Sequence, residues 1–161
     1  MKNNTFPYEI GRWAVLIVAV ISLMIQFGGN AQSQADAREV ADAVTACMDM
    51  ENMLEADNQL VKRFYGLDPS AFESCILYYP NTNMMAEEVL IVKLSDMSQQ
   101  EQVRKACLQR LDTQKTTFEG YGVEQYEMLE NKSIIDVRGN FVLFVVNPNA
   151  SQAQRAFRNA L

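Results

Sequence analysis

Six side chains at or near the ends of expected helices and strands could contact a partner or a ligand. They are Tyr65, Tyr78, Tyr79, Asn81, Asn83 and Tyr121. Aromatic rings with polar tips, placed at the margin of a sheet, suit the binding of a peptide, a sugar or a partner protein. The first interpretation of the tyrosines, however, is that they cover the hydrophobic core while their hydroxyls reach water or the backbone, and the binding surface is the alternative.

Acid–base chemistry has little support in the residue types. Glu87 and Glu88 form a carboxylate pair, but neighbours on a strand point to opposite faces and cannot share a substrate. The chain has no histidine, which excludes a histidine base, a histidine-oriented nucleophile and a histidine-ligated metal. Glycine-rich phosphate loops and calcium loops are also absent from the sequence. We therefore expect no catalytic residue, no metal site, no cofactor and no enzymatic activity.

The three cysteines, Cys47, Cys75 and Cys107, fall in three separate expected elements without metal-ligand spacing. Small buried hydrophobic residues are the first interpretation. One disulfide between two helix cysteines is the alternative in an oxidising compartment.

An apolar run near the N-terminus indicates export. Trp13–Phe27 contains only Ser22 and Gln26 as polar residues. It covers roughly 23 Å as a helix, and with the flanking glycines it approaches the minimum for a membrane span. An uncleaved anchor is the first interpretation, and a cleaved signal peptide and a buried core helix are the alternatives.

Basic residues set the expected orientation of that anchor. Lys2 and Arg12 precede the run, and the next basic residue is Arg38. The positive-inside rule places the N-terminus in the cytoplasm and the remainder outside. Without Lys2, Arg12 and Glu9, the chain from Gln32 onward keeps 12 basic and 19 acidic residues, a net charge of −7. Such a balance argues against nucleic acid as a partner and against lying on anionic lipid.

Hydrophobic periodicity outlines the exported part. It predicts helices near 37–48, 57–65, 98–119 and 123–129 and at the C-terminus, and strands over 72–79, 88–94, 133–137 and 140–146. Ser98 and Glu101 form the expected capping box of the long helix, and Gly66 and Gly120 are expected helix stops. A weak repeat relates the segment from Val89 to the segment from Val142, which either duplication or chance explains.

This order of elements predicts an α+β fold. Two β-β-α units would form a two-layer sandwich, with a mostly antiparallel sheet and helices on one face, behind a single N-terminal transmembrane helix. The expected organisation is a cytoplasmic N-region (1–12), a transmembrane anchor or signal segment (13–29), a linker (30–36) and an extracytoplasmic α+β domain (37–161).

Several local motifs resemble the family named domain of unknown function 4358. They are Tyr65-Gly66-Leu67, Glu87-Glu88, Gln114 to Phe118 leading to Tyr121, Glu130-Asn131 and Gly139-Asn140-Phe141-Val142, within a similarity from Val40 to Phe157. The resemblance implies a small bacterial envelope protein held by a lipid or an N-terminal helix. The lipidated cysteine is missing here, which leaves the helix as the anchor, and the resemblance implies no chemistry.

Two kinds of non-catalytic function follow from these observations. The first is a membrane-anchored extracytoplasmic interaction module for an envelope protein or polymer. The second is an accessory domain that binds a small molecule or peptide in a pocket near Tyr78, Tyr79 and Asn81. An enzyme acting through carboxylates or Cys75 is the least favoured interpretation.

Overall fold

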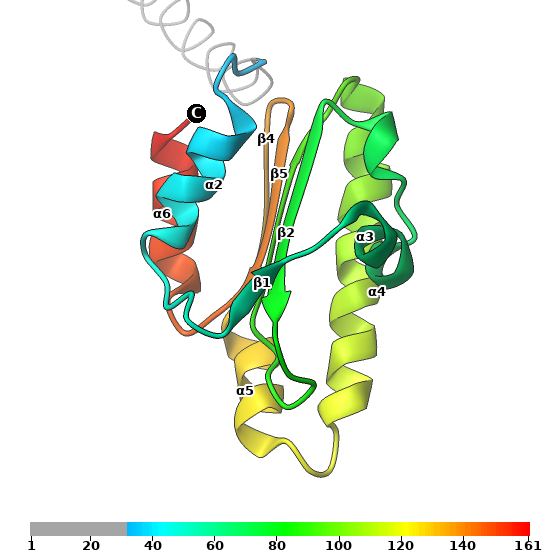
Figure 1. Ribbon diagram of the computed structural model, residues 1–161, viewed down its shortest axis with the longest axis vertical. Coiled ribbons are helices and arrows are strands. Elements are labelled where there is room, and N and C mark those ends of the chain that lie inside the picture. Colours follow the sequence, from blue (N-terminus) through cyan, green and yellow to red (C-terminus); the bar gives the residue numbers. More distant parts are fainter. Residues whose placement is uncertain (1–31) are drawn as a thin grey trace, which may run out of the picture. The chain divides into compact units, whose positions relative to one another are not determined.

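Strand pairing organises residues 32–161, the part of the chain that the computed structural model describes (Figure 1). The strands there are β1 (Met53–Glu55), β2 (Ser74–Pro80), β3 (Glu88–Lys93), β4 (Ser133–Arg138) and β5 (Phe141–Val146). They form one sheet in the order β1-β2-β3-β5-β4, with every neighbouring pair antiparallel. The expected α+β class and antiparallel sheet are confirmed, and the short edge strand β1 was not predicted.

The α-helices of the same residues are α2 (Ala37–Thr45), α3 (Asn58–Tyr65), α4 (Gln100–Phe118), α5 (Val123–Asn131) and α6 (Ala150–Asn159). Single turns of 3-10 helix, η1 (Pro69–Ala71) and η2 (Met97–Gln99), precede β2 and α4. Gly66 ends α3 in the left-handed conformation at φ 65°, a backbone angle that a residue without Cβ adopts at little cost. The expected stop of α3 is therefore confirmed.

The start of α4 differs from the prediction. The capping box is made by Asp96 and Gln99, not by Ser98 and Glu101: Asp96 accepts a hydrogen bond from the Ser98 backbone N–H at 2.7 Å. The Gln99 side chain accepts one from the Asp96 backbone N–H at 3.1 Å. The cap lies two residues earlier because η2 precedes the α-helix.

Helices cover both faces of the sheet, so the expected two-layer sandwich with helices on one face is wrong (Figure 1). Helices α3, α4 and α5 pack on one face, and α2 and α6 pack on the other. All six residues of β3 and all six of β5 are buried. A strand buried on both faces is typically a continuous apolar run without polar alternation. β5 (FVLFVV) has that sequence throughout, and β3 (EVLIVK) has it between Glu88 and Lys93.

Alternate residues of the strands divide between two hydrophobic cores. Leu90, Val92 and Phe144 belong to the core under α3, α4 and α5. Val89, Ile91 and Leu143 belong to the core under α2 and α6. Period-two alternation of side chains explains this division, since each central strand supplies both cores.

The weak internal repeat does not correspond to a simple duplication. The two β-β-α units exist in chain order as β2-β3-α4 and β4-β5-α6. Because β3 and β5 are antiparallel neighbours, only a twofold axis perpendicular to the sheet would exchange the two hairpins. Such a rotation keeps every helix on its own face of the sheet, so α4 and α6 would share a face, whereas they lie on opposite faces. Val89 and Val142, matched in the repeat, accordingly belong to different cores.

The predicted anchor at 13–29 lies outside the described residues. Within 32–161, no helix has the length and apolar character needed to cross a membrane. The residues just before α2 are hydrogen-bonded to the turn between β4 and β5: the Ser33 N–H donates to Asn140 Oδ1 at 2.8 Å. The Asn140 amide donates in return to the Ser33 carbonyl at 3.2 Å.

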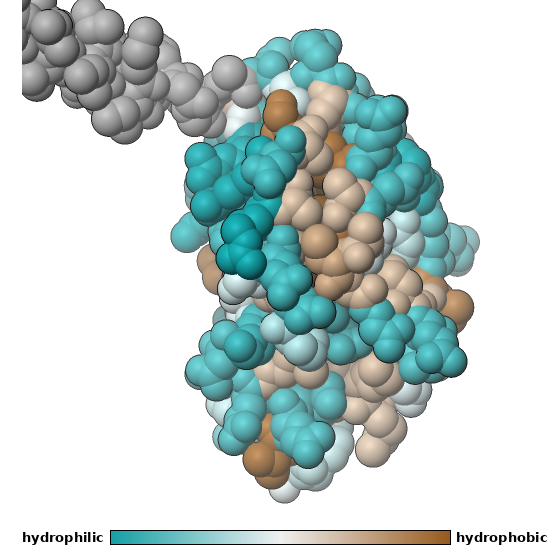
Figure 2. Space-filling model, turned by 90° about the vertical axis from the view of Figure 1, so that its left-hand side faces the viewer, coloured by the Kyte–Doolittle hydropathy of each residue, from teal (hydrophilic) through white to brown (hydrophobic). Residues whose placement is uncertain are grey.

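The outer surface of the α2–α6 layer is mostly hydrophilic (Figure 2). A narrow band of weakly to moderately apolar residues runs between two hydrophilic areas on this face (Figure 2). Half-exposed small residues of the two helices, such as Ala43 and Ala156, belong to this layer. Half-exposed small apolar residues of this kind are ordinary on a protein surface.

Candidate functional site

A groove on the α3–α4 side of the sheet brings together several of the residues proposed from the sequence. It has a volume of about 420 Å³, within the range typical of ligand pockets. We call it the α3 groove. Its lining residues are Leu54, Arg63, Phe64, Tyr79, Pro80, Asn81, Thr82, Asn83, Met85, Arg110, Gln114, Thr117 and Tyr121.

Aromatic and guanidinium groups are stacked at the centre of the groove. The ring of Phe64, on α3, meets the ring of Tyr79, on β2, edge to face at 5.9 Å between centroids. The guanidinium carbon of Arg110 lies 4.2 Å from the centre of the Phe64 ring. That of Arg63 lies 5.1 Å from the same centre. Cations are attracted to the negative face of an aromatic ring, so Phe64 helps to hold both groups in place.

A fully buried carboxylate lies beneath the groove. Glu88, at the start of β3, has no exposed surface, and Arg110 donates to it from Nε at 3.0 Å and from Nη2 at 2.6 Å. Gln114 donates to the same carboxylate at 3.2 Å, and the Tyr65 hydroxyl donates to its other oxygen. Burial, followed by the negative charge of Glu88, raises the pKa of Tyr65 well above its ordinary value. Tyr65 is therefore a neutral donor to Glu88.

The paired arginine stays ionised in this environment. Burial alone lowers the pKa of Arg110, but the hydrogen bonds and negative charge of Glu88 outweigh it and raise that pKa. A buried carboxylate is stable only when its lone pairs are used in this way. The network fixes the Arg110 guanidinium at the base of the groove.

Four of the six candidate residues line the α3 groove: Tyr79, Asn81, Asn83 and Tyr121. Tyr65 is buried below them and does not line the groove. Its hydroxyl donates a hydrogen bond to Glu88, the residue that holds Arg110. Tyr78 is not part of this site, because adjacent strand residues point to opposite faces. Its hydroxyl accepts a hydrogen bond from Arg38, on α2, at 3.0 Å.

Arg63, Phe64, Arg110 and Gln114 are groove residues that sequence reasoning missed. Arg110 and Gln114 are four positions apart on α4, on one face of the helix. Glu88 alternates with Leu90 and Val92, so it points to the same face of β3 as these two core residues. A glutamate on a core face, together with an arginine and a glutamine four positions apart on a helix, is the signal that could have identified this cluster. The sequence presents Glu88 only as one member of a carboxylate pair with Glu87, and its complete burial was not expected.

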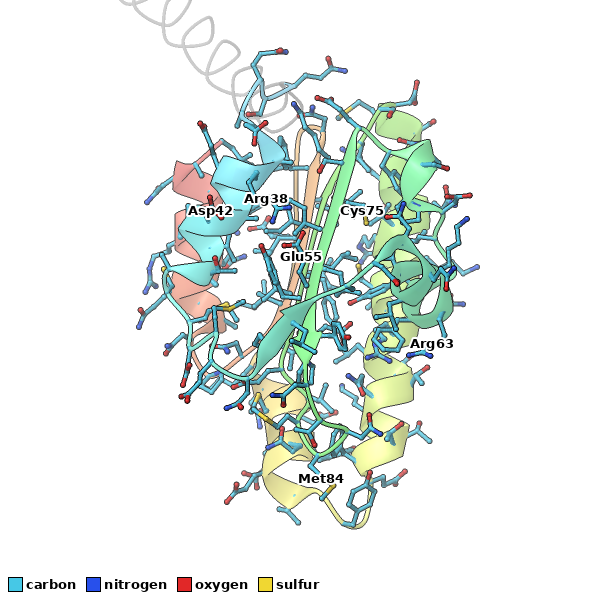
Figure 3. All side chains as sticks on the ribbon, viewed as in Figure 1. Arg38, Asp42, Glu55, Arg63, Cys75 and Met84 are labelled. Carbon is cyan, nitrogen blue, oxygen red and sulfur yellow. The ribbon has the colours of Figure 1, made fainter. Side chains whose placement is uncertain are left out.

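A second hollow, of about 350 Å³, lies on the α2 side of the sheet. Arg38 and Glu55 point toward one another there (Figure 3) and form an ion pair at 2.7 Å. Lys93 pairs with Glu73 at 2.6 Å at another part of its wall. Since both cations of this hollow are paired with acids, it lacks the unpaired positive charge of the α3 groove.

The cysteines Cys47, Cys75 and Cys107 are free thiols, so the alternative of a disulfide between helices is not supported. Burial raises the pKa of Cys75 to about 12. Burial also raises the pKa of Cys107, and the nearby charge of Glu88 adds to the effect. Both are poor thiolates and poor nucleophiles.

We expect a thiol reagent at pH 8 to label the folded protein at Cys47 first. Labelling of Cys75 and Cys107 should be at least about tenfold slower, because a thiol with a raised pKa supplies little thiolate. Peptide mass mapping over time measures the three rates. If Cys75 is labelled as fast as Cys47 in the folded protein, the expectation is wrong. As a control, unfolding in urea should make the three labelling rates equal.

Comparison with known proteins addresses the family resemblance. A family model described as a domain of unknown function, DUF4358, matches residues 46–147. The chain belongs to the DUF4358 family. The match confirms the predicted family over a shorter range than 40–157. No curated protein and no solved structure matches this chain. All residues of the α3 groove fall within the DUF4358 match, whereas α6 lies outside it.

Proposed function

We propose that this DUF4358 protein is a membrane-anchored, extracytoplasmic interaction module that binds an envelope protein or polymer without catalysis. The observation that carries the proposal is the α3 groove. Side chains from β2, the loop after it, α3, α4 and the α4–α5 link meet in one hollow of about 420 Å³. Aromatic, amide and guanidinium groups of this kind are enriched at binding surfaces.

The location rests on the N-terminal sequence. The apolar run at 13–29 follows Lys2 and Arg12, which is typical of a helix with a cytoplasmic N-terminus. Ser33, next to Gln32, donates its N–H to Asn140 in the turn between β4 and β5. Phe141, which follows, pairs with Lys93 at the end of β3, whereas the loop between β2 and β3 lies at the start of β3 (Figure 1). A tether joined at Gln32 is therefore attached away from the groove. This arrangement supports a tethered module with an accessible binding surface.

The second candidate is an accessory domain for a small molecule or a peptide. The volume of the groove favours it, since about 420 Å³ is enough for a compact ligand. Thermal stabilisation of the protein by one small molecule, lost on replacement of Tyr79, would support this function over the first.

Site-specific photo-crosslinking tests the interaction module. A photoreactive amino acid replaces Asn83 or Tyr121 in the full-length protein in native membranes, and both positions line the groove. The matched control is Arg155, which is exposed on α6, on the opposite side of the sheet. We expect one recurrent crosslinked partner from positions 83 and 121 and none from position 155.

Two results would overturn the proposal. One is a recurrent partner captured only from position 155, and the other is the absence of any crosslinked product from all three positions. The mass of the recovered chain reports separately on the anchor, because cleavage after the apolar run removes residues 13–29.

A further inference from the structure

We infer that the α3 groove binds an anionic saccharide, with a carboxylate of the sugar held by Arg63 and Arg110. This inference rests on the proposed function and names the class of ligand that the groove accepts. It starts from the charge of the lining. The thirteen lining residues include two arginines and no acidic residue, in a region, Gln32–Leu161, whose net charge is −7.

Arg110 has donors left for a ligand. Its Nε and Nη2 atoms are used by Glu88, whereas Nη1 makes no hydrogen bond within residues 32–161. Among those residues no fully buried side-chain nitrogen or oxygen lacks a partner, so Nη1 keeps some exposed surface, although the Arg110 side chain as a whole is only 13% exposed. Since Glu88 holds the guanidinium plane, the Nη1 donors are pre-organised for an oxyanion.

Arg63 supplies the second cation. It lines the groove, and none of the ion pairs formed among residues 32–161 includes it. Figure 3 shows Arg63 on α3, and its guanidinium lies against the Phe64 ring. The guanidinium groups of Arg63 and Arg110 both lie beside the Phe64 ring, and within the described residues Glu88 is the one carboxylate that pairs with them. The cluster therefore has one positive charge in excess. An anionic ligand group neutralises that excess.

The neutral lining favours a sugar as the carrier of the anion. Five amide or hydroxyl side chains line the groove: Asn81, Thr82, Asn83, Gln114 and Thr117. Such groups both donate and accept hydrogen bonds, as sugar hydroxyls do. Tyr121, a residue that is 59% exposed, offers a ring on which the apolar face of a pyranose can stack. A peptide made only of acidic residues would use the two arginines and, through its backbone, the neutral groups, but it has no ring to stack on Tyr121.

Titration calorimetry on the full-length protein in a neutral detergent tests the inference. The probes are trigalacturonate, its neutral methyl ester and triglutamate. We expect trigalacturonate to bind about tenfold more tightly than the ester, because only the acid form pairs with the arginines. Raising NaCl from about 50 to about 500 mM should weaken binding of the acid form alone.

Variants assign the roles of the residues. Arg63→Ala should weaken trigalacturonate binding about fivefold or more and leave the ester unchanged, whereas Arg63→Lys should retain part of the affinity. Tyr121→Ala should weaken both sugars alike, since stacking does not depend on charge. Arg155→Ala is the control and should change neither.

The outcomes separate this inference from the proposed function. Equal binding of trigalacturonate and its ester would overturn the anion selectivity. Triglutamate binding as tightly as trigalacturonate would overturn the saccharide class and point to an acidic peptide. If no probe binds while positions 83 and 121 still crosslink a partner, the inference fails and the interaction module stands. If crosslinking fails as well, the proposed function fails too.

Discussion

Replacing Glu88 with alanine is expected to lower the free energy of unfolding by about 3–5 kcal/mol. Glu88 is fully buried and accepts five hydrogen bonds, from Arg110, Gln114 and Tyr65. Without the carboxylate, a guanidinium whose side chain is only 13% exposed loses its counter-ion. The buried Tyr65 hydroxyl loses its acceptor at the same time. Orphaned buried groups of this kind carry the full cost of desolvation.

Urea unfolding of a chain shortened to residues 32–161 measures this effect, since those residues form a compact unit with two cores of their own. Glu87→Ala is the matched control, because Glu87 takes part in no ion pair among the described residues, and it should cost less than about 1 kcal/mol. In the double variant with Arg110→Ala, the loss should be smaller than the sum of the two single losses. A loss below about 1 kcal/mol for Glu88→Ala would show that the network does not stabilise the fold.

Phe157→Ala is expected to cost about 3–5 kcal/mol, although Phe157 is only four residues from the C-terminus. Its side chain is fully buried in the core between α2, α6 and the sheet. Its ring packs against Phe141 at 6.4 Å between centroids, near perpendicular. Such an aromatic pair adds to the area that the ring buries. Truncation leaves a cavity in a core that other helices cannot fill.

The same urea experiment measures this second effect, with Arg155→Ala as the control on the exposed side of α6. The control should change stability by less than about 0.5 kcal/mol. A small loss for Phe157→Ala would mean that α6 is dispensable and that the DUF4358 match at 46–147 contains the whole stable fold. A large loss would show that the second helical layer is part of the folding unit.

Local sequence determined most of the elements. The α3 helix begins after Asp57, whose side chain accepts a hydrogen bond from the Leu60 N–H at 2.8 Å, and it ends at Gly66. Both ends depend on a side chain or a backbone angle within a few residues. For that reason its limits were predictable. The three-residue strand β1 was not, because its stability comes from pairing with β2.

Tertiary structure decided which helices form each layer and which residues form the site. The apolar runs of β3 and β5 indicate burial on both faces, but which helices cover each face depends on where α2 and α6 return after long stretches of chain. Tyr79 and Tyr121 meet in one groove for the same reason, while Tyr78 is directed to the other face. Glu88 is buried because Arg110 and Gln114, more than 20 positions away, supply its hydrogen bonds. The sequence determines the local elements, because caps and periodicity act over a few residues; packing between distant segments determines the site.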